Sequence, residues 1–309
     1  MPAPSAPHIL MIFLDGVGLG RADAMNPLAD RSLGSFARMA AHQAWTDHAV
    51  PVLEPAHVFK GIDAKLGVKG LPQSGTGQAS LLTGENCALL AGRHYGPYPH
   101  SRTRGIIRER NVFRQVMALP GHGPESVAFS NAYPRRFFEL AEKRDRWTVT
   151  TRCCLDAGVE IRDTERLLAG DAVSADLTGA GWPEPGVLRK PITEGEAGRR
   201  LLRISRQHAF TLFEYYLTDK AGHARSTSMA EGVLASLNDV FGVLIEEMEP
   251  ASDLVLVTSD HGNLEDLSTK GHTTNAVPLI AIGARAGGFG RARDLTDVIP
   301  CVLAALSET

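Results

Sequence analysis

The chain has 309 residues, of which 43% are hydrophobic and 22% are charged, as in an ordinary globular protein. This length allows one large α/β domain, or a core with a smaller insert. A net charge of −3 gives no overall basic field, so we do not expect nucleic acid to be the principal partner. The cysteines lack metal-ligand spacing and are expected to be reduced thiols: Cys87, Cys153, Cys154 and Cys301.

The first predicted element is a strand at residues 9–14, a continuous apolar run that ends at Asp15. A run that is apolar on both faces is typical of a central strand covered by helices on both sides. The run is too short for the core of a signal peptide or for a membrane span. We therefore expect a cytoplasmic protein that is not bound to a membrane.

The next predicted elements follow this strand. Residues 75–82 are expected to turn from a loop into a helix, residues 111–119 to form a helix, and residues 126–130 to form a strand. The pattern then changes, with β-like residues at 147–153 and a Gly- and Pro-containing stretch at 179–191. We interpret residues 134–193 as an inserted lid and residues 1–133 and 194–309 as the core.

The last third of the chain predicts strands at residues 210–217, 253–257 and 277–282, and helices at 229–247 and 295–306. Three of the predicted strands end next to acidic or imidazole side chains. The fold class that we predict is α/β, with a mostly parallel central sheet and helices on both faces. Ligands of such sheets gather at the carboxyl ends of the strands, so one site assembled from distant segments is expected.

The candidate ligands of that site combine carboxylate, imidazole and hydroxyl groups: Asp15, Asp219, His223, Asp260, His261, His272 and Thr76. Three carboxylates and three imidazoles can hold two divalent cations at about 3.5–4 Å, as in phosphoryl-transfer sites. Zinc and manganese suit these ligands, and magnesium suits them less well. Any one of these residues alone is more often a surface or turn residue, and the joint pattern favours the metal site.

The loop at residues 72–80 is rich in small residues and precedes a predicted helix, whose amino terminus attracts anions. Its hydroxyl groups belong to Ser74, Thr76 and Ser80. We take Thr76 as the nucleophile, and for the two serines a turn or helix-cap role is the alternative.

The chain resembles the alkaline phosphatase superfamily, and within it the metalloenzyme domain of cofactor-independent phosphoglycerate mutase. The resemblance covers residues 8–92 and 205–305 and is carried by these motifs: Asp15-Gly16, Asp219-x-x-Gly222-His223, Asp260-His261-Gly262-Asn263 and His272-Thr273-Thr274-Asn275-x-Val277-Pro278. It implies that Asp15, Thr76, Asp260 and His261 bind one metal, and that Asp219, His223 and His272 bind the other. The mutase has Asn-Ser at the nucleophile with a His four residues later, and it carries a much larger inserted domain. This chain has Gly75-Thr76 and Ser80 instead.

Two further patterns have competing interpretations. The loop at residues 94–104 could line a phosphate pocket with His94, His100, Arg102 and Arg104, or it could be a solvated basic loop. The glycines at residues 16, 18 and 20 after the first strand resemble a dinucleotide fingerprint. The third glycine lacks the required spacing, and Asp15 would repel a pyrophosphate.

The function that we expect is phosphoryl transfer with a small phosphorylated substrate, most simply by a phosphomonoester hydrolase that forms a phosphothreonine. A phosphomutase of the phosphoglycerate mutase type is the second hypothesis. Phosphodiester or phosphonate hydrolysis remains open, because the same metal pair serves these reactions. A metal-binding protein without catalysis would be expected to lack a ligand or the nucleophile, and none is missing.

Overall fold

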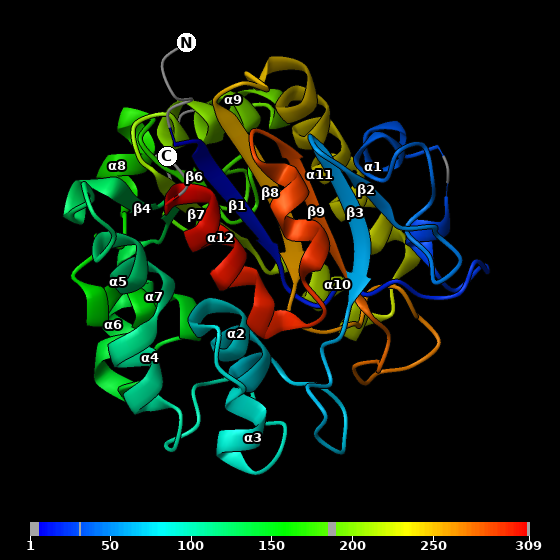
Figure 1. The fold of residues 1–309 in the computed structure, drawn as a ribbon, viewed down its shortest axis with the longest axis horizontal. Helices are drawn as coiled ribbons and strands as arrows, with labels where there is room; N and C mark the ends of the chain where they lie inside the picture. The colour runs from blue at the N-terminus through cyan, green and yellow to red at the C-terminus, as the bar shows by residue number, and fades with distance from the viewer. Residues whose placement is uncertain (1–5, 31, 185–189, 308–309) are drawn as a thin grey trace.

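The computed structural model describes residues 6–30, 32–184 and 190–307, so part of the predicted stretch at residues 179–191 lies outside the described residues. Its centre is a seven-stranded sheet with the order β2-β3-β9-β8-β1-β7-β4 (Figure 1). The strands are β1 (His8–Leu14), β2 (Val52–Glu54), β3 (His57–Ile62), β4 (Val127–Phe129), β7 (Phe210–Tyr215), β8 (Asp253–Ser259) and β9 (Val277–Gly283).

The apolar run of β1 lies in the middle of this sheet, between β7 and β8. Strands β1, β4, β7 and β8 are parallel, and β9 runs antiparallel to β8 and to β3. The predicted α/β class with a mostly parallel sheet is confirmed. Strands β2 and β3 were not predicted; β2 is short and mostly exposed, so it has no strong apolar alternation.

Helices cover both faces of the sheet (Figure 1). One face is covered by α2 (Ser74–Thr83), α3 (Cys87–Ala91), α4 (Arg104–Arg110), α5 (Val112–Met117), α7 (Val149–Ala157) and α12 (Val298–Ser307). The other is covered by α1 (Gly34–Met39), α9 (Glu194–Ser205), α10 (Leu217–Ala224) and α11 (Thr227–Glu247). Alternate residues of β1 point to opposite faces, so Met11 packs in the first core and Ile12 in the second.

Helix α11 is long and apolar enough to cross a membrane by length and composition. In this fold, however, Leu237, Phe241 and Leu244 of α11 are buried in the core beside the sheet. The helix packs against α9 and α1 through this face, which is the arrangement of a helix with one buried side.

Part of the predicted lid packs against the central sheet. Residues 134–193 contain α6 (Arg135–Arg144), α7, α8 (Thr164–Ala169) and β6 (Val173–Ser174), which pairs with β5 (Asn131–Ala132). Val149, Cys153 and Cys154 are fully buried in the same apolar cluster as Ile9 and Phe210. Part of this segment therefore packs on the sheet, and the role of residues 134–193 as a lid stays a prediction.

The β-like pattern at residues 147–153 was misread. These residues begin α7, whose first turn is capped by the Thr148 side chain, which accepts a hydrogen bond from the Thr151 amide. Val149 and Cys153 are four residues apart, so a helix places them on one face, where both are buried. Burial of this face outweighs the weak strand preference of Val and Thr.

A buried carboxylate, Glu214 of β7, joins this segment to the sheet. Glu214 is 4% exposed, and its Oε2 accepts hydrogen bonds from the Thr150 hydroxyl at 2.6 Å and the Tyr133 hydroxyl at 3.3 Å. Burial raises the pKa of Glu214 to about 6, and the two hydroxyl groups oppose this shift. The proton is therefore bound more tightly in the folded protein than in the unfolded chain.

We predict that Glu214 makes the protein less stable as the pH rises. A raised folded pKa favours folding fully below the unfolded value of 4.5, and this contribution is lost as the pH rises through about 6. The loss amounts to about 2 kcal/mol. Glu214→Gln keeps an oxygen for both hydroxyl groups and should show no such loss. Urea unfolding of both metal-free proteins at about pH 5 and about pH 7.5 measures it. Identical pH dependence in the two proteins would contradict this prediction.

Candidate metal centre

The six predicted carboxylate and imidazole ligands come together at the carboxyl ends of three adjacent strands. Asp15 follows β1, Asp260 and His261 follow β8, and α10, which follows β7, provides Asp219 and His223. His272 lies in the loop before β9. Because β1, β7 and β8 are parallel neighbours, their carboxyl ends lie at the same edge of the sheet.

The first group of ligands consists of Asp15, Asp260 and His261, and all three are buried. Their ligand atoms lie within 4.8 Å of one another. The Nε2 atom of His261 is 3.3 Å from Oδ1 of Asp15 and 3.5 Å from Oδ2 of Asp260. Two carboxylates and one imidazole around one point form a suitable set for a divalent cation.

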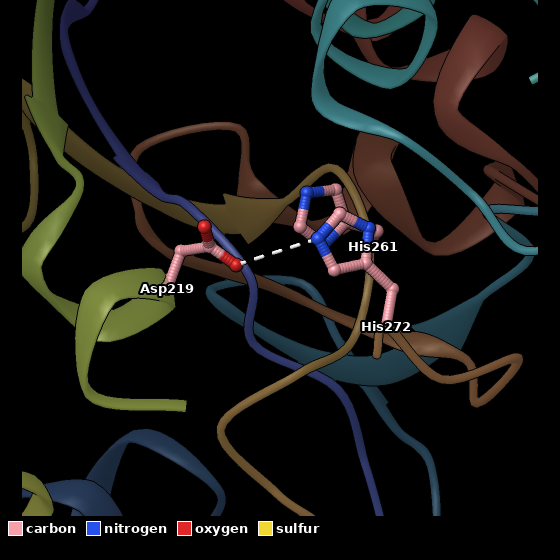
Figure 2. Close-up of side chains that lie close together, drawn as sticks. All are labelled: Asp219, His261 and His272. Atoms are coloured by element: carbon pink, nitrogen blue, oxygen red, sulfur yellow. Dashed lines mark ion pairs between the residues drawn. The ribbon is translucent and has the colours of Figure 1, made fainter. Parts of the chain in front are cut away.

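The second group consists of Asp219, His223 and His272. The Nε2 atom of His223 is 3.3 Å from Asp219 Oδ2, and Nε2 of His272 is 3.7 Å from Asp219 Oδ1. The Nε2 atoms of the two histidines are 3.3 Å apart. Figure 2 shows Asp219 facing His261 and His272, whose rings stack with centroids 3.8 Å apart. The two groups therefore lie side by side.

Backbone carbonyl groups orient two of the imidazoles. Nδ1 of His272 is 2.7 Å from the Pro72 carbonyl oxygen, and Nδ1 of His223 is 3.0 Å from that of Lys270. A carbonyl oxygen can only accept, so each Nδ1 must hold the proton and each Nε2 is left with a free lone pair. Such contacts behind metal-binding histidines fix the tautomer that binds the cation.

The electrostatics of the centre fit a pair of cations. Burial, followed by repulsion from Asp260 and Asp219, holds the pKa of Asp15 well above its usual range. Burial and then the charge of Asp219 do the same to the pKa of Asp260. Burial and the neighbouring His272 lower the pKa of His261 well below its usual range, which keeps this imidazole neutral. Among the described residues, Asp15 Oδ1 and Asp260 Oδ2 have no hydrogen-bond partner although they are buried. Cations at these atoms would compensate the buried negative charge.

The hydroxyl group at the centre belongs to Ser74. Its Oγ is 3.0 Å from Nε2 of His261, at the first residue of α2. Thr76 is fully buried on the other side of the helix, where its hydroxyl lies 3.3 Å from the Tyr95 carbonyl oxygen and accepts from the Tyr95 amide at 3.1 Å. Two residues along a helix correspond to a rotation of about 200°, so the two side chains point in opposite directions. The prediction that placed Thr76 among the ligands is therefore corrected.

The sequence contained a signal for Ser74 that the prediction overlooked. The pair Gln73-Ser74 with Gln78 four residues later has the spacing of Asn-Ser and His in the mutase. Gln78 is 3% exposed, and its Nε2 lies 3.4 Å from Asp15 Oδ2. Ser80, the third candidate, is a structural residue: its hydroxyl donates to the Thr76 carbonyl oxygen and accepts from the Cys87 amide.

The four residues predicted to bind substrate lie in different surroundings in the structure. His94 lies 3.3 Å from the Val68 carbonyl oxygen, and burial lowers its pKa. His100 packs edge-on against the Tyr95 ring, and Arg102 is exposed. None of these three forms a hydrogen bond or an ion pair with a candidate metal ligand within residues 6–30, 32–184 and 190–307. Arg104 does line a cavity, together with Tyr95.

Glu265 was not predicted, and it holds the ligand-bearing loops together. It is 1% exposed, and Oε2 accepts hydrogen bonds from the amides of Gly18 and Asn263, each at 2.8 Å. Oε1 accepts from the Thr273 hydroxyl and, at 3.0 Å, from Nδ2 of Asn275. The carboxylate thus connects the loops that follow β1 and β8 with the loop that precedes β9.

Glu265 also explains the glycines that resemble a dinucleotide fingerprint. A Cβ atom at Gly18 would collide with the Glu265 carboxylate, and one at Gly20 would lie 2.7 Å from its Cγ. Gly16 has a φ of +69°, and a Cβ there would lie 2.6 Å from Asp219 Oδ1. The first loop is glycine-rich because it packs tightly against the metal centre.

We predict that Glu265→Ala destabilises the protein by more than about 3 kcal/mol, because several buried donors lose their acceptor at about 1–3 kcal/mol each. It should also weaken metal binding, since the loops carrying Asp260 and His272 are no longer connected. Urea unfolding and metal titration measure the two effects. Glu231→Ala removes an exposed carboxylate of α11 and should change neither. Wild-type metal affinity in the Glu265 variant would rule out a positioning role.

Comparisons with known proteins agree with this geometry. Residues 193–307, which contain five of the six ligands, match the family model described as the Metalloenzyme superfamily. A 2,3-bisphosphoglycerate-independent phosphoglycerate mutase of Paracoccus denitrificans is 33% identical over 126 residues, covering 38% of this chain and 23% of the mutase. That of Desulforudis audaxviator is 28% identical over 208 residues, covering 62% of this chain and 38% of the mutase. The chain thus spans less than two fifths of the length of either relative.

Solved structures share the fold. A mutant of the alkaline phosphatase from the Antarctic bacterium TAB5, with Mg bound, superposes with a TM-score of 0.51 at 12% identity, covering 99% of both chains. Phosphoglycerate mutase of Leishmania mexicana superposes with a TM-score of 0.52 at 10% identity, covering 99% of this chain and 96% of the mutase. Family model, relatives and fold agree with the ligand geometry: residues 193–307 match the Metalloenzyme superfamily, and the chain has the fold of an alkaline phosphatase and of a phosphoglycerate mutase.

Proposed function

We propose that the protein is a phosphomonoester hydrolase that uses two divalent metal ions and forms a phosphoserine at Ser74. The observation that carries this proposal is the position of the Ser74 hydroxyl, 3.0 Å from Nε2 of His261 and therefore among the metal-binding groups. Zinc and manganese suit the carboxylate and imidazole ligands, and magnesium is the alternative.

The residues of the centre would have distinct roles as metal ligands and as nucleophile. Asp15, Asp260 and His261, with Ser74, would hold one cation, and Asp219, His223 and His272 the other. The bound cations would neutralise the phosphate oxygens and make the serine hydroxyl easier to deprotonate. The Ser74 oxygen would then attack phosphorus, and the amino terminus of α2 would favour the anionic substrate at this point. Water would release the phosphate from Ser74 in a second step.

The exposure of the centre supports hydrolysis. The side chain of His223 is 46% exposed and that of Asp219 is 17% exposed, whereas those of Asp260 and His261 are fully buried. Water can thus reach the second group of ligands. A mutase has to exclude water while it retains its substrate.

A phosphomutase is the second candidate, because the curated relatives are named as phosphoglycerate mutases. The match covers less than two fifths of these relatives, so their substrate is a hypothesis for this chain. The same phosphoserine would serve both reactions.

The test is activity after reconstitution with Zn²⁺, Mn²⁺ or Mg²⁺. We expect release of inorganic phosphate from p-nitrophenyl phosphate and from a panel of natural phosphomonoesters. Conversion of 3-phosphoglycerate to its 2-isomer without phosphate release would establish the mutase instead. Activity on phosphodiesters alone, with none on monoesters, would overturn the proposal.

A further inference from the structure

We propose that a basic and aromatic cleft beside the nucleophile binds a second anionic group, a phosphate or a carboxylate, of the substrate. This inference rests on the proposed phosphoryl transfer and specifies its substrate class. The cleft has a volume of about 550 Å³ and lies between the loop at residues 95–99, the first residue of α4, and the turn from α6 to α7. Neither the family motifs nor the metal ligands include any residue that lines it.

Positive charge dominates the lining of the cleft. Arg104, Arg144, Arg146 and Arg152 line it, and Asp145 is the acidic residue among them. Arg152 forms an ion pair with Asp156 at 3.1 Å. Within residues 6–30, 32–184 and 190–307, no ion pair is formed by Arg104, Arg144 or Arg146. Several guanidinium groups without carboxylate partners around one cleft repel one another, and a bound anion would relieve this repulsion.

Aromatic rings form the other part of the lining and make the site more than a solvated basic surface. Tyr95, Tyr98 and Trp147 border the cleft together with two prolines. The guanidinium of Arg146 lies over the Tyr98 ring, 5.7 Å from its centroid. Stacking restricts the mobility of this side chain, so less conformational entropy is lost when it binds an anion.

The loop that lines the cleft also packs against the nucleophile. The Thr76 amide donates to the Tyr95 carbonyl oxygen at 2.9 Å, next to Ser74 in the first turn of α2. A Cβ atom at Gly75 would collide with the Tyr98 carbonyl oxygen, and one at Gly96 would lie 3.3 Å from the Ser74 amide nitrogen. No side chain thus separates the nucleophile turn from the loop whose tyrosines line the cleft.

These positions define a class of substrate. The metal centre takes the phosphate that is transferred, and the cleft takes a second anion at the other end of the molecule. Binding energy from the remote group would orient the substrate at Ser74. Suitable substrates are short bisphosphates, or phosphate esters of hydroxy acids, in preference to monoesters with a neutral leaving group.

The test compares α,ω-alkanediol bisphosphates with alkyl monophosphates over a graded series of chain lengths. We expect kcat/KM for the preferred bisphosphate to exceed that of the matched monophosphate by about tenfold or more, mainly through KM. The same comparison with ω-phosphoalkanoates distinguishes a phosphate from a carboxylate as the second anion. The preference should decrease as the salt concentration rises, because the arginines are largely exposed.

Arg144→Ala combined with Arg146→Ala should bring the ratio of the two kcat/KM values close to one. Arg136→Ala removes an exposed arginine of α6 that does not line the cleft, and it should leave the ratio unchanged. Melting temperatures would show that each variant is folded. A binding readout comes from Trp147, whose fluorescence should respond to a bisphosphate in the Ser74→Ala protein but not in the double arginine variant.

The outcomes separate the two proposals. Absence of phosphate release from every ester would reject the proposed function, whereas release without preference for a second anion would reject the cleft alone. A cleft that binds a bisphosphate without competing with an alkyl monophosphate would be a separate anion site and would also overturn this inference. A preference that persists in the double arginine variant would place the second anion elsewhere.

Discussion

Ser74→Ala should lower kcat for phosphomonoesters by at least about 10³-fold, while Thr76→Val should retain activity of the wild-type order. The Ser74 hydroxyl is the one that lies among the metal ligands, 3.0 Å from His261 Nε2. That of Thr76 is held by the backbone of Tyr95 on the opposite side of α2. Steady-state kinetics of the two metal-loaded variants measures the difference.

Thr76→Val should also lower the folding stability of the protein, and the assay conditions have to allow for this. The Tyr95 amide would lose its acceptor, and such a loss in a buried place costs about 1–3 kcal/mol of stability. The assay should therefore be made well below the melting temperature of this variant. A folded Thr76→Val protein without activity, beside an active Ser74→Ala protein, would restore Thr76 as the nucleophile.

Metal binding should stabilise the protein strongly, because the cations compensate carboxylates that are buried together. At a free metal concentration of about 1,000 times Kd, the unfolding free energy should rise by about 4 kcal/mol. Asp260→Asn should change the stability of both the metal-free and the metal-bound protein. The metal-free variant should be more stable than the metal-free wild type, since a buried carboxylate that repels Asp15 and Asp219 is removed. The same variant should gain less stability from metal.

Thermal or urea unfolding with and without Zn²⁺ or Mn²⁺ measures both effects. Asn at this position keeps an oxygen that can accept from the Gly16 amide, as Asp260 Oδ1 does at 3.3 Å. Asp239→Asn, which removes an exposed carboxylate of α11, is the matched control and should change neither value. A metal-free Asp260→Asn protein that is less stable than the wild type would show that burying this carboxylate does not destabilise the metal-free protein.

The central strands of the sheet and the clustering of the candidate ligands could be predicted because each depends on local sequence. The run at β1 is apolar on both faces, and the groups at its end and at the end of β8 are the chemical types that cations bind. Because β1 and β8 are adjacent and parallel, Asp15 and Asp260 at their carboxyl ends lie close together. In the regions that resemble the family motifs, the candidate ligands lie close together in the structure.

The features that were not predicted correctly from the sequence are those that depend on tertiary packing. The register of the loop before α2 determines whether residue 74 or residue 76 faces the metal centre, and three hydroxyl residues in seven positions leave this register open. The role of Val149 and Cys153 depends on which helices they contact, which composition does not reveal. Glu265 acts through backbone amides of distant loops, and no local pattern indicates such contacts.

The most direct test of the account is the location of the phosphate in the phosphoenzyme. The metal-loaded protein is incubated with a phosphomonoester, quenched in acid, digested, and analysed by mass spectrometry. We predict one phosphorylated residue, Ser74, which is lost in Ser74→Ala and retained in Thr76→Val. Phosphate on Thr76 would contradict the assignment of the nucleophile. Rapid turnover without any phosphorylated residue would contradict covalent transfer through the hydroxyl group at the metal centre.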